Sequence, residues 1–378
     1  MRNVFDYVKE MRQQSFSATV VNEVDALALS MLVYTDFSGI LDENSDETLS
    51  QVNRRFWELH SEAEITAAGA HAKRSPFLLR EMADSVRYGE IRLKNYVNAI
   101  SLVDVKQFAA VTCSLPDGSD FVAYRGTDGT VTGLIEDFKF SFSTTAGQED
   151  AVDYLNLYHR GHERPILLGG HSKGGNLAVY AATYCEVGIQ ERIERIYSYD
   201  GPGFKAEVLG AEEYKRILPR VLSIVPKDCL IGTMMHNRYN TIVTDSERSF
   251  IHQHDTFQWH IEDNHFKELP DRSEVSKFFE KIVDNWLHRC DEKKRREILD
   301  VLLALIIDNK LVTEDDRKLS ARFFYNLILN TPKLSGSDKS LLLSSISAIF
   351  VSTSVVSAGV IKEKATRVMK RVRRRIGE

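Results

Sequence analysis

Short apolar runs alternate with helical segments through the middle of this 378-residue chain. The apolar runs begin near residues 96, 108, 121, 165, 195 and 220. The second and third are joined by Pro116-Asp117-Gly118, which is typical of a hairpin turn. Strands that alternate with helices predict an α/β fold with a mostly parallel sheet and helices on both faces. The functional site of such a sheet lies at the carboxyl ends of its strands.

The two ends of the chain have a different pattern from the middle. Residues 1–90 have mostly helical character, including Ser75-Pro76 as a helix start, and from about Ser273 onward every segment has helical character. We therefore expect an N-terminal helical part packed on the core (1–90), an α/β core (91–272) and a C-terminal helical subdomain (273–378).

Composition adds constraints on the compartment. The first ten residues carry charges where a secretory signal would need an apolar run. The four cysteines, none in a Cys-x-x-Cys pair, do not indicate a disulfide framework, a redox pair or a zinc site. We expect a cytoplasmic protein that needs no metal and no cofactor.

Charge is concentrated at the C-terminus. Residues 362–378 hold eight Lys/Arg against two glutamates, although the whole chain has a net charge of -5. An acidic body argues against specific nucleic-acid binding, whereas the basic tail suits an anionic surface. The preceding residues, 341–361, carry no charge. Residues 341–378 are therefore a candidate membrane contact, with a buried helix of the subdomain as the alternative.

The strongest chemical motif is Gly170-His171-Ser172-Lys173-Gly174. It stands between an apolar strand and a small-residue helix, which is the strand–turn–helix setting of a nucleophile elbow. Glycines on both sides of Ser172 avoid collisions with the neighbouring strand and helix. The first helical amide, that of Lys173, would face a developing oxyanion. We expect the side chains of His171 and Lys173 to point away from the serine.

A second loop carries the other expected oxyanion donor. The strand at 121–124 runs into Arg125-Gly126-Thr127, where an α/β-hydrolase places this donor. Gly126 permits a close approach of the backbone, and Thr127 offers an amide. An ordinary turn after a strand is the alternative interpretation.

The acid and base of a triad follow the nucleophile in the order Asp or Glu, then His. We prefer Asp228, which follows the strand at 220–225, and hold Asp200 in reserve because it follows the strand before. Among the downstream histidines we prefer His254, which lies between apolar residues, to His252 and His260.

Together these motifs resemble the bacterial Mbeg-like family, lipase-related proteins of unassigned function, and more distantly the class 3 lipases. The resemblance covers roughly residues 3 to 290, and its motifs are Asn22-Glu-Val-Asp-Ala26, Tyr124-Arg-Gly-Thr-Asp128, Gly170-His-Ser-Lys-Gly-Gly175, Tyr199-Asp-Gly-Pro-Gly203 and His254-Asp-Thr-Phe-Gln-Trp259. It implies an α/β-hydrolase fold with Ser172, Asp228 and His254 as the triad and Thr127 at the oxyanion position.

The sequence thus predicts a serine hydrolase that cleaves an acyl ester or lipid through an acyl-enzyme. Two alternatives stay open. One is an inactive hydrolase-like scaffold that binds a lipid or a protein, and the other is a thioesterase or peptidase with the same triad.

Overall fold

The computed structural model describes residues 1–67, 73–101, 106–127, 144–236, 239–248, 250–277, 280–281, 284 and 291–293. The chain divides into two compact units, Met1–Arg272 and Ser273–Glu378. Nearly all described residues belong to the first unit, and the candidate membrane contact at 341–378 lies outside them. None of the helices within the described residues has the length and hydropathy needed to cross a bilayer.

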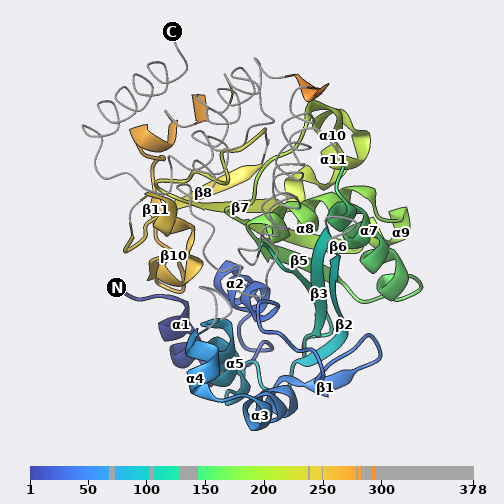
Figure 1. Ribbon diagram of the computed structural model, residues 1–378, viewed down its shortest axis with the longest axis vertical. Helices are drawn as coiled ribbons and strands as arrows, with labels where there is room; N and C mark the ends of the chain where they lie inside the picture. The colour runs from blue at the N-terminus through green and yellow to red at the C-terminus, as the bar shows by residue number, and fades with distance from the viewer. Residues whose placement is uncertain are drawn as a thin grey trace, which may run out of the picture. The chain divides into compact units, whose positions relative to one another are not determined.

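Within the described residues, nine strands form one mixed sheet at the centre of the first unit (Figure 1). In spatial order they are β1 (Asp46–Thr48), β2 (Arg92–Ser101), β3 (Lys106–Ser114), β4 (Asp120–Tyr124), β5 (Ile166–His171), β6 (Ile193–Tyr199), β7 (Val221–Pro226), β8 (Asn240–Thr244) and β11 (Glu268–Leu269). Strands β4 to β8 run parallel, and the remaining pairs are antiparallel. Between β8 and β11 in the chain, β9 (Ile261–Glu262) and β10 (His265–Phe266) form a separate two-stranded sheet.

Alternate side chains of the central strands enter two separate cores. On β3, Phe108 and Ala110 belong to one core, whereas Ala109 and Val111 belong to the other. This two-residue period is that of a strand buried on both faces. Helices α7 (Ala146–His159) and α8 (Lys173–Tyr184) contribute to the first core, and α2 (Glu23–Leu32) contributes to the second. The sheet is therefore the middle of three layers.

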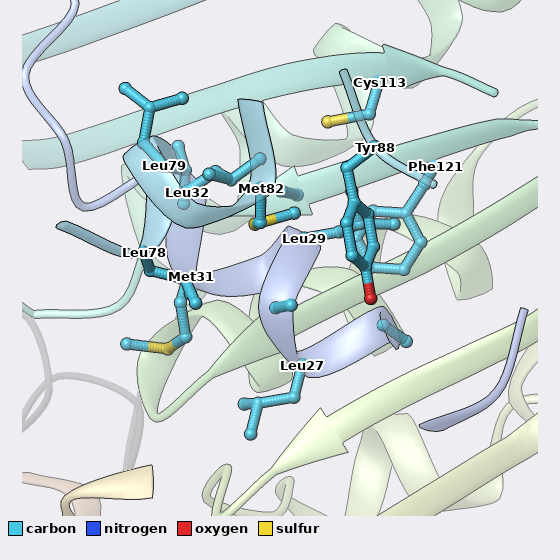
Figure 2. Packing of buried hydrophobic residues seen from close by; sticks show 14 of the residues in the cluster. Leu27, Leu29, Met31, Leu32, Leu78, Leu79, Met82, Tyr88, Cys113 and Phe121 are labelled. Atoms are coloured by element: carbon cyan, nitrogen blue, oxygen red, sulfur yellow. The ribbon is translucent and has the colours of Figure 1, made fainter. Parts of the chain in front are cut away.

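Helix α2 is buried along almost its whole length. Figure 2 shows its leucines beside side chains of α5 (Ser75–Ala83) and of the sheet, including Phe121. Because α2 packs on strands on one side and on helices on the other, it is apolar around most of its circumference. A capping box at Asn22 fixes its start: the Asn22 side chain accepts from the Asp25 amide, and Asp25 accepts from the Asn22 amide.

A buried ion pair connects α2 to the segment that leads into β2. Asp25 and Arg87 have fully buried side chains, with Nε to Oδ1 at 2.8 Å and Nη2 to Oδ2 at 2.6 Å. The fork geometry satisfies both carboxylate oxygens, and the guanidinium lies 4.1 Å from the Phe16 ring centre. The ion pair thus links two segments of the N-terminal part to each other, while apolar packing of α2 holds this part on the sheet.

The other helices are shorter or lie nearer the surface. They are α1 (Val4–Met11), α3 (Leu49–Leu59), α4 (Glu62–Ala67), α9 (Val187–Gln190), α10 (Ala206–Gly210) and α11 (Glu212–Ile217), with the 3₁₀ turns η1 (Leu218–Arg220), η2 (Phe250–His254) and η3 (Thr256–Gln258).

The predicted α/β fold is confirmed, and all six predicted apolar runs are strands of the sheet. The prediction omitted β1, β8 and β11. These strands lie at or next to the edges of the sheet, and β1 and β11 are too short and too exposed to have an apolar run.

Candidate active site

Ser172 stands alone between the end of β5 and the first residue of α8. Its backbone has φ 59° and ψ -129°, a conformation that residues other than glycine rarely adopt. Two bonds impose it: the Ser172 amide donates to the Tyr199 carbonyl at 2.8 Å, and the Ser172 carbonyl accepts from the Gly175 amide at 3.0 Å. The serine side chain is consequently held at the carboxyl end of β5, and the residue is 8% exposed.

Glycines make this turn possible because no Cβ would fit beside it. A Cβ on Gly170 would lie 2.3 Å from the carbonyl of Gly174, and one on Gly174 would lie 2.1 Å from the carbonyl oxygen of Tyr124 in β4. Both distances are shorter than any real Cβ contact. The helix can therefore start directly above the strand only with glycine at both positions.

The two neighbours of Ser172 direct their side chains elsewhere, as predicted. Lys173 is buried, and its Nζ donates to the Gln107 carbonyl at 2.6 Å. His171 is buried between the Tyr34 hydroxyl, 3.1 Å from Nδ1, and the His254 carbonyl, 2.9 Å from Nε2. The backbone amide of Lys173 stands at the first position of α8, directly after Ser172.

His254 is bonded to Asp200, not to the aspartate that the sequence analysis preferred. The Nδ1 of His254 lies 2.6 Å from Oδ2 of Asp200. A carboxylate can only accept, so Nδ1 carries a proton, and in the neutral ring Nε2 then has the lone pair that a base needs. The histidine side chain is 21% exposed and the aspartate side chain 1%. Asp228 as the acid partner of His254 is therefore corrected to Asp200.

The reason for the correction is the order of strands in the sheet. Strand β6 lies directly beside β5, and Asp200 is the first residue after β6. Asp228 comes two residues after β7, one strand farther from Ser172. Sequence alone identified both positions as strand ends, but it did not show which of them faces the histidine.

Asp200 is held by three donors. Oδ2 accepts from His254. The other oxygen, Oδ1, accepts from the Gly232 amide at 3.0 Å and lies 2.9 Å from Sγ of Cys229. The Asp200 backbone has φ 49°, and its amide donates to the Ile224 carbonyl of β7. Burial and the adjacent carboxylate raise the pKa of the Cys229 thiol well above its usual value, so Cys229 is a neutral donor.

Asp228 has a different structural task. Its backbone amide donates to Oε1 of Gln253 at 2.8 Å, and its carboxylate accepts from Nε2 of the same side chain at 3.2 Å. The Gln253 carbonyl in turn accepts from Nε1 of Trp259 at 2.6 Å. Asp228 thus fixes the residue that directly precedes His254.

The loop after β4 lies against the turn that holds Ser172. A Cβ on Gly126 would be 2.3 Å from both the His171 carbonyl oxygen and the Tyr34 hydroxyl, and 3.2 Å from Cβ of Ser172. Thr127, the next residue, is half-buried. The loop therefore lies beside Ser172, and the oxyanion roles of the Thr127 and Lys173 amides stay predictions.

Ser172 and His254 come from segments that touch. The rings of His171 and His254 have centres 4.4 Å apart, and Ser172 is the next residue after His171. In the part of the chain that the structure describes, the Ser172 hydroxyl makes no hydrogen bond to the His254 ring. Such bonds are often long before substrate is bound. The described residues contain no group of three or more His, Cys, Asp or Glu arranged to hold a metal ion.

Sequence reasoning missed Tyr34, which reaches the site from the N-terminal part. It follows the last turn of α2, is buried, and contacts both His171 and the Gly126 loop. No motif in residues 1–90 marks it, because a tyrosine after an apolar helix is usually a core residue. No sequence motif pointed to Cys229 as a residue of the site either.

Comparison with solved structures finds lipases. The M37 lipase is 12% identical with a TM-score of 0.35, covering 57% of this chain and 70% of that one. The Rhizomucor miehei lipase in its propeptide complex is 11% identical with a TM-score of 0.36 (58% and 66%), and the lipase from Rhizopus microsporus var. chinensis is 13% identical with a TM-score of 0.35 (59% and 73%). No curated protein matches the chain.

The comparison with protein families gives a match over more than half of the chain. The Mbeg1-like family matches residues 82–304, a range that includes most of the sheet, Ser172, Asp200 and His254. It begins later than the resemblance seen in the sequence, which included α2. The chain therefore belongs to the Mbeg1-like family.

Proposed function

We propose that the chain is a serine hydrolase that cleaves an acyl ester, with Ser172 as nucleophile, His254 as base and Asp200 as the acid that orients it. The bond of 2.6 Å between His254 and Asp200 carries this proposal, because it joins two residues 54 positions apart at the end of the strand beside Ser172. A buried carboxylate on Nδ1 is the arrangement that orients a catalytic imidazole.

The reaction follows from these positions. His254 Nε2 removes the proton of Ser172 as Oγ attacks the ester carbonyl, and the resulting imidazolium is stabilised by Asp200. The imidazolium then returns the proton to the leaving alcohol, which leaves an acyl-serine. Water repeats the sequence and releases the acid. The amides of Lys173 and Thr127 are the donors for the negative oxygen of each tetrahedral intermediate.

A fluorophosphonate probe tests the nucleophile, because it reacts only with an activated serine. We expect the wild-type protein to be labelled on Ser172, and we expect Ser172→Ala and His254→Ala to remain unlabelled while their circular dichroism is unchanged. Ser223→Ala is a matched control: Ser223 is also a buried serine at a strand of the sheet, on β7, and its loss should leave labelling intact. A folded wild-type protein that does not react would favour the non-catalytic scaffold.

A second measurement identifies the bond that is cleaved. Acyl esters, thioesters and amides of the same acyl chain are compared by kcat/KM, and we expect the ester to be preferred. A preference for the thioester or the amide would contradict the proposed substrate class but would be consistent with the proposed triad.

A further inference from the structure

The histidine before the nucleophile has two definite hydrogen-bond roles. Nε2 of His171 lies 2.9 Å from the His254 carbonyl oxygen, and a carbonyl can only accept, so Nε2 carries a proton. In the neutral ring Nδ1 then has a lone pair, and the Tyr34 hydroxyl donates to it at 3.1 Å, with the His171 carbonyl oxygen as a second, longer acceptor at 3.4 Å. A directed chain results, from Tyr34 through His171 to the backbone of His254.

This chain is well shielded from water. Tyr34 is 4% exposed and His171 is 1% exposed, so neither side chain offers a surface to substrate. Hydrogen bonds in such surroundings lose little to competing water and fix geometry more firmly than exposed ones. The chain therefore acts on the position of His254 rather than on substrate binding.

Two further contacts place the same pair at the centre of the site. The His171 ring lies 4.4 Å from the His254 ring, so it limits the tilt of the proposed base. The Tyr34 hydroxyl also touches the Gly126 loop, where a Cβ would come within 2.3 Å of it.

We propose that Tyr34 and His171 are positioning residues that hold the His254 backbone and ring in the geometry needed to deprotonate Ser172. The proposal rests on the proposed function and extends it to the N-terminal part of the chain, which thereby becomes necessary for full activity.

Kinetics of four variants test it. Tyr34→Phe removes one neutral hydrogen bond, so we expect kcat to fall by about 3- to 10-fold with KM unchanged. His171→Phe keeps a ring but loses both bonds, so we expect a larger fall. Adding Tyr34→Phe to His171→Phe should then change kcat by less than Tyr34→Phe does in the wild type, because the hydroxyl has already lost Nδ1 and keeps only its longer bond to the carbonyl of residue 171 at 3.4 Å. His171→Gln, which keeps an N–H for the His254 carbonyl, should recover part of the loss.

Tyr96→Phe is the matched control. Tyr96 is also 4% exposed, and its hydroxyl accepts from the Phe37 amide at 3.2 Å, outside the chain that ends at His254. We expect its kcat to equal that of the wild type. If Tyr34→Phe and His171→Phe behaved like Tyr96→Phe, the positioning role would be wrong even though the protein is a hydrolase.

A spectroscopic arm separates this inference from the proposed function. The Nδ1 proton between His254 and Asp200 should give a low-field proton NMR signal that is absent in His254→Ala and Asp200→Asn. We expect His171→Phe to shift the signal and to speed its exchange with water. An inactive wild-type protein would refute the hydrolase, whereas an unchanged signal in His171→Phe would refute the positioning role, whatever the activity.

Discussion

Two aspartates, each following a strand, have different tasks because of what surrounds each carboxylate. Asp200 is buried and accepts from His254, the Gly232 amide and the Cys229 thiol. Asp228 is held in a pair of bonds with Gln253. The first arrangement orients an imidazole, and the second fixes a loop.

The variants Asp200→Asn and Asp228→Asn should therefore differ in kcat. In Asp200→Asn the oxygen can still face Gly232, so the amide NH₂ faces Nδ1 of His254 and forces the proton to Nε2, where it blocks proton removal. We expect kcat to fall by roughly 10³- to 10⁴-fold, as for the same change in a serine-protease triad. In Asp228→Asn an oxygen still accepts from Gln253, so we expect less than about a 3-fold change. Steady-state ester hydrolysis measures both, and equal losses would contradict the assignment of Asp200.

At the scale of elements, the junction of β5 and α8 depends on contacts with β4. Gly174 belongs to the first turn of α8, and its Cα faces the carbonyl of Tyr124. Helix propensity alone would favour alanine at this position. The neighbouring strand excludes it, because backbone cannot move aside as a flexible side chain can.

Gly174→Ala should thus lower the free energy of unfolding, by about 2 kcal/mol or more, because overpacking against backbone is costly. Gly188→Ala in α9 is the matched control, since a Cβ there meets no atom within 4 Å. We expect the control to be neutral or to stabilise by up to about 1 kcal/mol. Urea unfolding gives both values. Equal stability of the two variants would show that α8 can move away from β4.

At the scale of the whole molecule, stability depends on polar groups buried between the sheet and its helices. His159, the last residue of α7, is 1% exposed, and its Nε2 lies 3.2 Å from the Thr112 hydroxyl of β3. Burial lowers the pKa of His159 to about 4, although the Asp120 carboxylate 3.9 Å from Nδ1 opposes the shift. The imidazole is therefore neutral in the folded protein at pH 7.

This buried imidazole makes folding sensitive to acid. The unfolded state takes up the proton near pH 6.5 and the folded state near pH 4, so stability falls as the pH decreases between these values. The full effect is about 3 kcal/mol. In His159→Gln the urea midpoint should lose this part of its pH dependence, while other acid-sensitive groups act equally in both proteins. The same slope in variant and wild type would show that His159 does not take part.

The sequence by itself determined the α/β class and the strand–turn–helix around Ser172, and it named His254 as the candidate base. These are local properties. Apolar residues recur every two positions in a strand and about every four in a helix, and glycines mark the positions where a side chain does not fit. Short strands at the edges gave no such signal.

Only the tertiary structure decided between Asp200 and Asp228, and only it brought Tyr34 and Cys229 to the site. Which carboxylate reaches the histidine depends on the spatial order of β5, β6 and β7, and that order is not written in any single segment. Tyr34 and His171 are 137 residues apart and meet because α2 packs on the central strands, so their contact is a consequence of the complete fold.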